Sequence, residues 1–166
     1  MKKIAIAFLL ILGTITTQAQ ELTWETNVKK AAELSNKTHK PMFLFFTGSD
    51  WCGWCLRLQK DVFKTPEFVE WAKKSVILVE LDFPRKTPQS QEIMQQNNEL
   101  QQAFGVQGYP TVWFANGTLK DGKVNFSQLG SKGYGPNPKE WIEDANKIIG
   151  NVAKPEEAQK KSNSKN

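Results

Sequence analysis

The sequence has very few cysteines and histidines. Its 166 residues include two Cys and one His. A closed structural zinc site takes four ligands, usually Cys and His, so we expect no zinc site within one chain. Two cysteines also exclude the multi-disulfide framework of small secreted domains, and a chain of this length can bury enough apolar surface to fold without one. Any special cysteine chemistry must therefore come from a single pair.

Excess charge of one sign is also missing. The net charge is +5, with 22 basic and 17 acidic residues, and the lysines are scattered along the chain. A mild, dispersed positive charge indicates a solvated surface, whereas a nucleic-acid interface gathers its basic residues on one face. The composition, 39% hydrophobic and 23% charged, is ordinary for a globular domain. We therefore expect no nucleic-acid partner.

No apolar run is long enough to span a bilayer. The longest, Ile4–Ile15, is well short of the roughly 20 apolar residues that a membrane helix needs. Lys2 and Lys3 precede it and Thr16-Thr17-Gln18-Ala19 follows, an order typical of a secretory signal peptide. The sequence predicts a cleaved signal peptide at 1–19, one domain at 20–150 and a disordered polar tail at 151–166. The mature protein is expected to be periplasmic or secreted, with no stable membrane insertion.

The hydrophobic pattern predicts alternating strands and helices. The continuous apolar runs Met42–Phe46 and Val76–Asp82 are typical of strands buried on both faces of a sheet. Further strands are expected at Leu22–Trp24, Thr111–Ala115 and Val124–Leu129, with turns at Asn116-Gly117 and Asp121-Gly122. Helices are expected at Asn27–Asn36, Cys52–Lys60, from Thr65 onward, at Ser90–Phe104 and from Asn137 to Gly150. This order predicts an α/β fold, with a mixed central β-sheet and helices on both faces.

The two cysteines lie in the stretch Trp51-Cys52-Gly53-Trp54-Cys55, just after the first buried strand. Covalent haem attachment needs a histidine after the second cysteine, and Leu56 stands there. A structural disulfide is the main alternative, but a bridge that closes two intervening residues removes little chain entropy. At the first turn of a helix, free N–H groups and the helix dipole stabilise a thiolate. The pattern therefore favours a redox-active pair, with a lowered pKa for Cys52.

The order of strand, turn, Trp-Cys-x-x-Cys and helix resembles the thioredoxin superfamily. Gly108-Tyr109-Pro110-Thr111, just before a strand, resembles a second signature of that family, and the likeness covers about 24–149. The segment from Trp51 to Phe68 also resembles the C-terminal domain of the bacterial thiol:disulfide interchange protein that carries electrons across the membrane. The resemblance implies a thioredoxin-like fold and a cis Tyr109–Pro110 bond beside the cysteines.

The resemblance also implies thiol–disulfide exchange without a metal or organic cofactor. Cys52 would attack a substrate disulfide, and Cys55 would then resolve the mixed disulfide. The substrate would lie on a platform formed by Trp51, Gly53, Trp54, Tyr109 and Pro110. The partners would be protein thiols and disulfides, together with a membrane electron donor. Reduction or electron relay is the favoured direction; a disulfide oxidase or isomerase and a non-catalytic binding module are the alternatives.

Two positions depart from the family pattern. Thioredoxins usually place a buried aspartate six residues before the first cysteine, where it assists proton transfer, and Phe46 stands at that count here. Asp50 and Glu80 are candidate replacements, and the sequence does not select between them. Trp54 stands where many relatives have proline.

Overall fold

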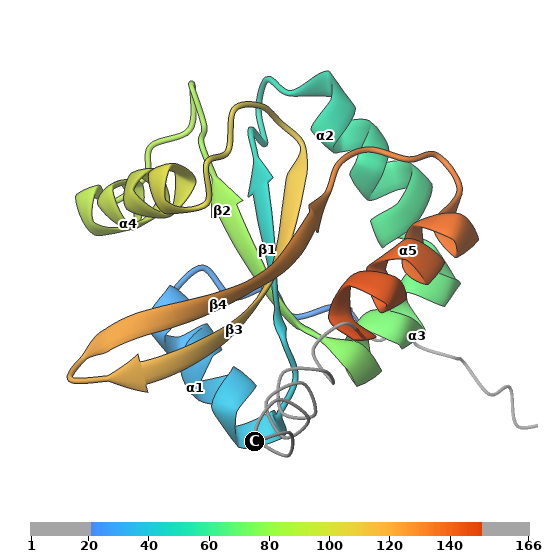
Figure 1. The fold of residues 1–166 in the computed structure, drawn as a ribbon. Helices are drawn as coiled ribbons and strands as arrows, with labels where there is room; N and C mark the ends of the chain where they lie inside the picture. Colours follow the sequence, from blue (N-terminus) through green and yellow to red (C-terminus); the bar gives the residue numbers. More distant parts are fainter. Residues whose placement is uncertain (1–20, 151–166) are drawn as a thin grey trace, which may run out of the picture.

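The computed structural model describes residues 21–150, and its centre is one four-stranded sheet (Figure 1). The strand order is β2-β1-β3-β4; β1 pairs parallel with β2 and antiparallel with β3, and β3 pairs antiparallel with β4. The strands are β1 Met42–Thr47, β2 Ile77–Asp82, β3 Thr111–Lys120 and β4 Lys123–Lys132. The predicted mixed sheet is therefore confirmed. The predicted signal peptide and tail lie outside the described residues.

Helices cover both faces of the sheet, as predicted. Figure 1 shows α1 and α4 on one side and α2, α3 and α5 on the other. The helices are α1 Val28–Thr38, α2 Gly53–Leu58, the π-helix η1 Gln59–Phe63, α3 Pro66–Ser75, α4 Gln91–Ala103 and α5 Pro138–Gly150. The connection from β1 to β2 through α2, η1 and α3 is the crossover that parallel pairing requires.

The central strand β1 divides the interior into two cores. Phe43 and Phe45 face α2, η1, α3 and α5, in what we call the cysteine-side core, which also contains Cys52 and Cys55. The far-side core lies against α1 and α4 and takes the alternate strand residues Met42, Leu44 and Phe46. Every residue of β1 is buried, because helices cover the strand on both faces.

Local sequence signals begin several helices where expected. The Thr65 hydroxyl accepts a hydrogen bond from the N–H of Phe68, and Pro66 takes the first helical position of α3. Ser90 caps α4 in the same way through the N–H of Ile93. The predicted helix Cys52–Lys60 is shorter as an α-helix and continues as η1. The wider π turn brings Phe63 into the cysteine-side core, where its ring lies 5.0 Å from Phe45 and 4.7 Å from Phe68.

Two strand predictions are wrong. Asn116-Gly117 is not a turn, because β3 continues through it to Lys120; the hairpin turns at Asp121-Gly122, where both residues have positive φ. Gly117 is needed inside the strand, since a Cβ there would lie 2.6 Å from the sulfur of Met42. In place of the short strand at Leu22–Trp24 there is a single bridge between Glu25 and Val79. None of the helices between residues 21 and 150 has the length and apolar character needed to cross a membrane.

Candidate active site

Cys52 and Cys55 form a disulfide at the start of α2, with 5.3 Å between their Cα atoms. The turn that leads from β1 into this helix is closed by the N–H of Cys52, which donates to the carbonyl of Gly48. Asp82, at the end of β2, holds the same turn by accepting hydrogen bonds from the N–H and hydroxyl of Ser49. The pair therefore lies at the end of the two parallel strands, on a turn fixed from both.

The two sulfurs differ in exposure and in their hydrogen bonds. Cys52 is the N-cap residue and is 6% exposed, whereas Cys55 is fully buried. The N–H of Cys55 donates to the Sγ of Cys52 over 3.2 Å. A negative charge on Cys52 would strengthen this hydrogen bond, and the helix dipole acts in the same direction. Cys52 is the better placed of the two to react from the surface.

One wall of the site is built from Trp51 and Tyr109. Their ring centroids lie 5.8 Å apart, and Tyr109 also stacks on Phe83 at 5.2 Å. The indole N–H of Trp51 donates to the carbonyl of Phe83, and the Tyr109 hydroxyl donates to Gln101. The Tyr109–Pro110 bond is cis, as predicted. The structure thus joins Trp51 to the predicted Tyr109–Pro110 segment.

Trp54 lies on the other side of the cysteines and is 54% exposed. Its ring packs on Tyr134 at a centroid distance of 5.1 Å. Gly53, between the cysteines, is exposed, and a Cβ added there would meet no atom within 4 Å. The sequence-based analysis missed Tyr134, although an aromatic residue between Gly133 and Gly135 in a polar loop is a usable signal.

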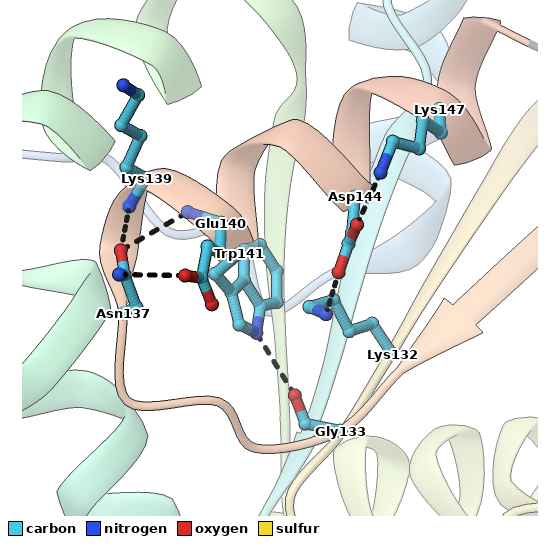
Figure 2. A network of polar contacts seen from close by, with 8 residues as sticks. All are labelled: Lys132, Gly133, Asn137, Lys139, Glu140, Trp141, Asp144 and Lys147. Carbon is cyan, nitrogen blue, oxygen red and sulfur yellow. Dashed lines mark hydrogen bonds and ion pairs between the residues drawn. The ribbon is translucent and has the colours of Figure 1, made fainter.

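The loop that carries Tyr134 is fixed by α5, as Figure 2 shows. The indole N–H of Trp141 donates to the carbonyl of Gly133, and Asn137 caps the helix. Asp144 pairs with Lys132 at the end of β4 and with Lys147 on α5, and these hydrogen bonds lower its pKa to about 2. Trp141 is buried, as predicted from its place on the apolar face of the helix.

Tyr134 is also held from the helix side of the site. Its hydroxyl donates to the Oδ2 of Asp61 in η1 over 2.9 Å. This hydrogen bond is the main cause of a raised pKa for the Tyr134 hydroxyl. Tyr134 is therefore a fixed support for the exposed Trp54 ring.

The strand position that faces the cysteines is Phe45 rather than Phe46. Phe46 points into the far-side core and lies 6.1 Å from Phe104, whereas Phe45 belongs to the cysteine-side core. Counting six residues back from Cys52 therefore selects Phe46, whose side chain points to the face of β1 away from the cysteines. Both candidates are phenylalanine, so this face of β1 still lacks the usual acid.

The two candidate replacement acids have different environments. The Asp50 carboxylate accepts hydrogen bonds from the backbone N–H groups of Arg85, Lys86 and Thr87, which lower its pKa to about 2. Asp50 therefore anchors the loop after β2. Glu80 pairs with Phe45 across the sheet and is half-buried, and burial followed by the charge of Asp82 raises its pKa. Of these two carboxyl groups, Glu80 is the one on the cysteine side of the sheet.

Residues 21–150 contain no cluster of three or more His, Cys, Asp or Glu side chains that could hold a metal ion. The site is thus a dithiol or disulfide at a helix start, flanked by Trp51 and Trp54 and bordered by the Tyr109–Pro110 segment. This arrangement can carry out thiol–disulfide exchange with a cysteine of a polypeptide that binds across the site.

The fold and the Cys52–Cys55 disulfide define a thioredoxin-like protein, and comparison with known proteins agrees. The family model described as "Thioredoxin-like domain" matches residues 28–131, and the chain belongs to this family. With its disulfide of CxxC spacing, it is a thiol–disulfide oxidoreductase. The predicted thioredoxin-superfamily membership is confirmed.

Two curated proteins and one solved structure are similar to the chain. The chain is 40% identical to "Disulfide bond reductase DsbH" of Chlamydia pneumoniae over 117 residues, which cover 70% of each chain. It is 30% identical to "Thioredoxin-related protein DsbJ" of the same organism, over 65% of this chain and 33% of that protein. A solved structure of a DsbH oxidoreductase is 32% identical, with a TM-score of 0.70 over 86% of this chain and 94% of that one.

Proposed function

We propose that the protein is an exported protein-disulfide reductase that uses Cys52 and Cys55. The observation that carries the proposal is the asymmetry of the pair: Cys52 lies at the helix start under the N–H of Cys55, and Cys55 is buried behind it. A thiolate at the helix start that is more accessible than its fully buried partner can attack a substrate, and the partner can then release it from that substrate. Trp51, Gly53, Trp54, Tyr109 and Pro110 form the platform for the substrate chain.

In the reaction, the Cys52 thiolate attacks one sulfur of a substrate disulfide. The substrate S–S bond breaks, and the departing sulfur takes up a proton. Cys55 then loses its proton and attacks the Sγ of Cys52, which forms the Cys52–Cys55 bond and releases the second substrate sulfur. Two electrons pass from the dithiol to the substrate. No metal or organic cofactor takes part.

Reduction is the proposed direction for two reasons. A relative with 40% identity is named a disulfide bond reductase. The Gly53-Trp54 dipeptide between the cysteines has Trp54 next to Cys55, so the histidine that stabilises the thiolate in strongly oxidising relatives is missing. The signal-like sequence at 1–19 supports a periplasmic or secreted location, where a membrane donor would return the pair to the dithiol form.

The test is the equilibrium potential of the Cys52–Cys55 pair against a glutathione series, combined with turnover of a peptide disulfide. We expect a potential nearer to that of thioredoxin, about −270 mV, than to the −120 mV of the most oxidising member of the superfamily. Cys52→Ser should abolish turnover, and Cys55→Ser should accumulate the mixed disulfide. In the dithiol form, Cys52 should be alkylated first, with a pKa below the roughly 8.5 of a free thiol.

Three results would contradict the proposal. A potential near −120 mV would favour a disulfide oxidase or isomerase. No turnover with any peptide would favour a binding module. First modification at Cys55 would reverse the roles of the two cysteines.

A further inference from the structure

The only two arginines in the sequence, Arg57 and Arg85, lie on the two tryptophans that flank the cysteines. The guanidinium carbon of Arg57 is 4.8 Å from the centre of a Trp54 ring, and that of Arg85 is 3.8 Å from a Trp51 ring. Both arginine side chains are exposed, whereas the other basic residues are lysines. Each of the two tryptophans that flank the cysteines therefore carries a guanidinium group stacked on its ring.

The two arginines come from different parts of the fold, Arg85 from the loop after β2 and Arg57 from α2. Arg85 lies in the loop after β2, and Trp51, on which it stacks, contacts the same loop through Phe83. Trp54 packs on Tyr134, which follows β4. Because β2 and β4 are the two edge strands, the ring of Trp51 contacts the loop at one edge of the sheet and the ring of Trp54 contacts the loop at the other, which puts the two arginine stacks on different sides of the cysteine pair.

Both guanidinium groups keep their hydrogen-bond donors free within the described part of the chain. The nearby aspartates have other partners: Asp61 accepts from the Tyr134 hydroxyl, and Asp50 accepts from the backbone after β2. The ion pairs found among residues 21–150 involve lysines. Each guanidinium therefore presents up to five N–H donors to a ligand.

A stacked arginine can bind a carboxylate in a fixed geometry, which a lysine in the same place would do less well. A planar guanidinium on an indole face is held in one orientation, and its edge can bind a carboxylate through two parallel hydrogen bonds. Less side-chain entropy is then lost when a partner binds. Two such groups, one on each side of the reacting sulfur, form a charged rim around an apolar centre.

We propose that the site selects polypeptide substrates with carboxylate side chains on both sides of the reacting cysteine. This inference rests on the proposed function and adds its substrate class. A polypeptide fits better than a small disulfide, because the ligand must cross both tryptophans to reach Arg57 and Arg85 together. Its cysteine lies over Cys52, and acidic residues before and after it pair with the two guanidinium groups. The exchange chemistry is unchanged, and the arginines act on substrate binding.

The experiment compares three disulfide-linked peptides that differ only in the residues flanking the cysteine, which are Glu, Gln or Lys. We expect kcat/KM to fall in the order Glu, Gln, Lys, with a gain of about two- to fivefold from each arginine–carboxylate pair. The Glu-to-Gln ratio should fall toward one at 1 M salt, where the Debye length is about 3 Å. In the double variant Arg57→Gln/Arg85→Gln the ratio should fall to about one at low salt as well.

Two controls distinguish a local effect of Arg57 and Arg85 from an effect of the protein's net charge and from an effect of substrate size. Lys139→Gln removes one positive charge from an exposed position on α5 and should leave the Glu-to-Gln ratio unchanged. Oxidised glutathione carries carboxylates but cannot cross the site, so its reduction should be less sensitive to the double variant than that of the Glu peptide. The thermal midpoint of each variant checks its folding.

The outcomes distinguish this inference from the proposed function. Equal rates for the Glu and Gln peptides would overturn the inference and leave the reductase intact. A preference that survives in the double variant would also overturn it. If no peptide is reduced at all, the proposed function itself fails.

Discussion

Among single residues, Gly117 has a clear structural reason for being glycine. It lies within β3, directly over the far-side core, where the sulfur of Met42 and the Cβ of Ala32 would lie 2.6 and 3.3 Å from an added Cβ. Met42 and Ala32 are themselves fully buried, so neither has free space to move into. The missing side chain lets α1 and β1 pack closely against β3.

Gly117→Ala should therefore destabilise the protein by about 1–3 kcal/mol, the usual cost of overpacking a filled core. Denaturant unfolding measures it, through the midpoint at an unchanged m-value. Gly108→Ala is the matched control, because a Cβ at Gly108 meets no atom within 4 Å. Equal stability of the two variants would show that Met42 can move aside.

At the scale of elements and the loops between them, the loop after β2 is held by a single side chain, that of Asp50. Asp50, in the turn before α2, accepts three backbone hydrogen bonds from this loop, and Phe83 and Arg85 of the loop contact Trp51. The loop therefore forms one wall of the site because a charged carboxylate holds it there.

Asp50→Asn should loosen this loop, and the effect should depend on pH. The pKa of Asp50 is lowered from 3.8 to about 2 in the folded protein. A carboxyl with a lowered folded pKa stabilises the fold above its unfolded pKa, and this contribution is lost as pH falls toward 2. We therefore expect the difference in unfolding free energy between wild type and variant to have its largest value above pH 4 and to shrink as the pH falls from 4 to 2.

Unfolding measured across that pH range checks the prediction, with amide exchange at Arg85, Lys86 and Thr87 as the local measurement. Asp121→Asn, in the distant hairpin turn, should leave the exchange of these amides unchanged. A stability difference that stays constant from pH 4 to 2 would mean that the charge of Asp50 does not hold the loop.

For the whole molecule, the redox state of the pair and the stability of the fold are linked. A dithiol protein is a strong oxidant when its reduced form is the more stable one, and a reductant when its oxidised form is. Arg57 and Arg85 add positive charge near the pair, which favours the thiolate and opposes the reducing direction. The proposed reductase therefore requires that the packing of the disulfide form outweighs this charge effect.

We expect the disulfide form to unfold at a higher guanidinium concentration than the dithiol form. Unfolding of both forms, with the same m-value analysis, measures the difference. Cys52→Ser/Cys55→Ser, which cannot form the bond, should have the same midpoint under oxidising and reducing conditions. A dithiol form that is more stable than the disulfide form would contradict the reducing direction.

The sequence by itself determined what depends on neighbouring residues. The caps at Thr65 and Ser90 begin their helices through hydrogen bonds three residues away, and the cysteine spacing puts both sulfurs on one helical turn. The apolar runs determined the buried strands. These local signals, with the two family motifs, were enough to predict the fold class and the residues around the disulfide.

The tertiary structure decided what depends on contacts between distant residues. Asn116-Gly117 has the local signal of a turn, but packing of β3 against α1 keeps it extended, and Asp121-Gly122 turns instead. Strand pairing put Phe45 rather than Phe46 on the cysteine side and placed Glu80 beside it. The order of strands in the sheet brought Tyr134 to Trp54 and Arg85 to Trp51 from opposite edges, because residues after β2 and β4 can meet at the site only once the sheet has formed.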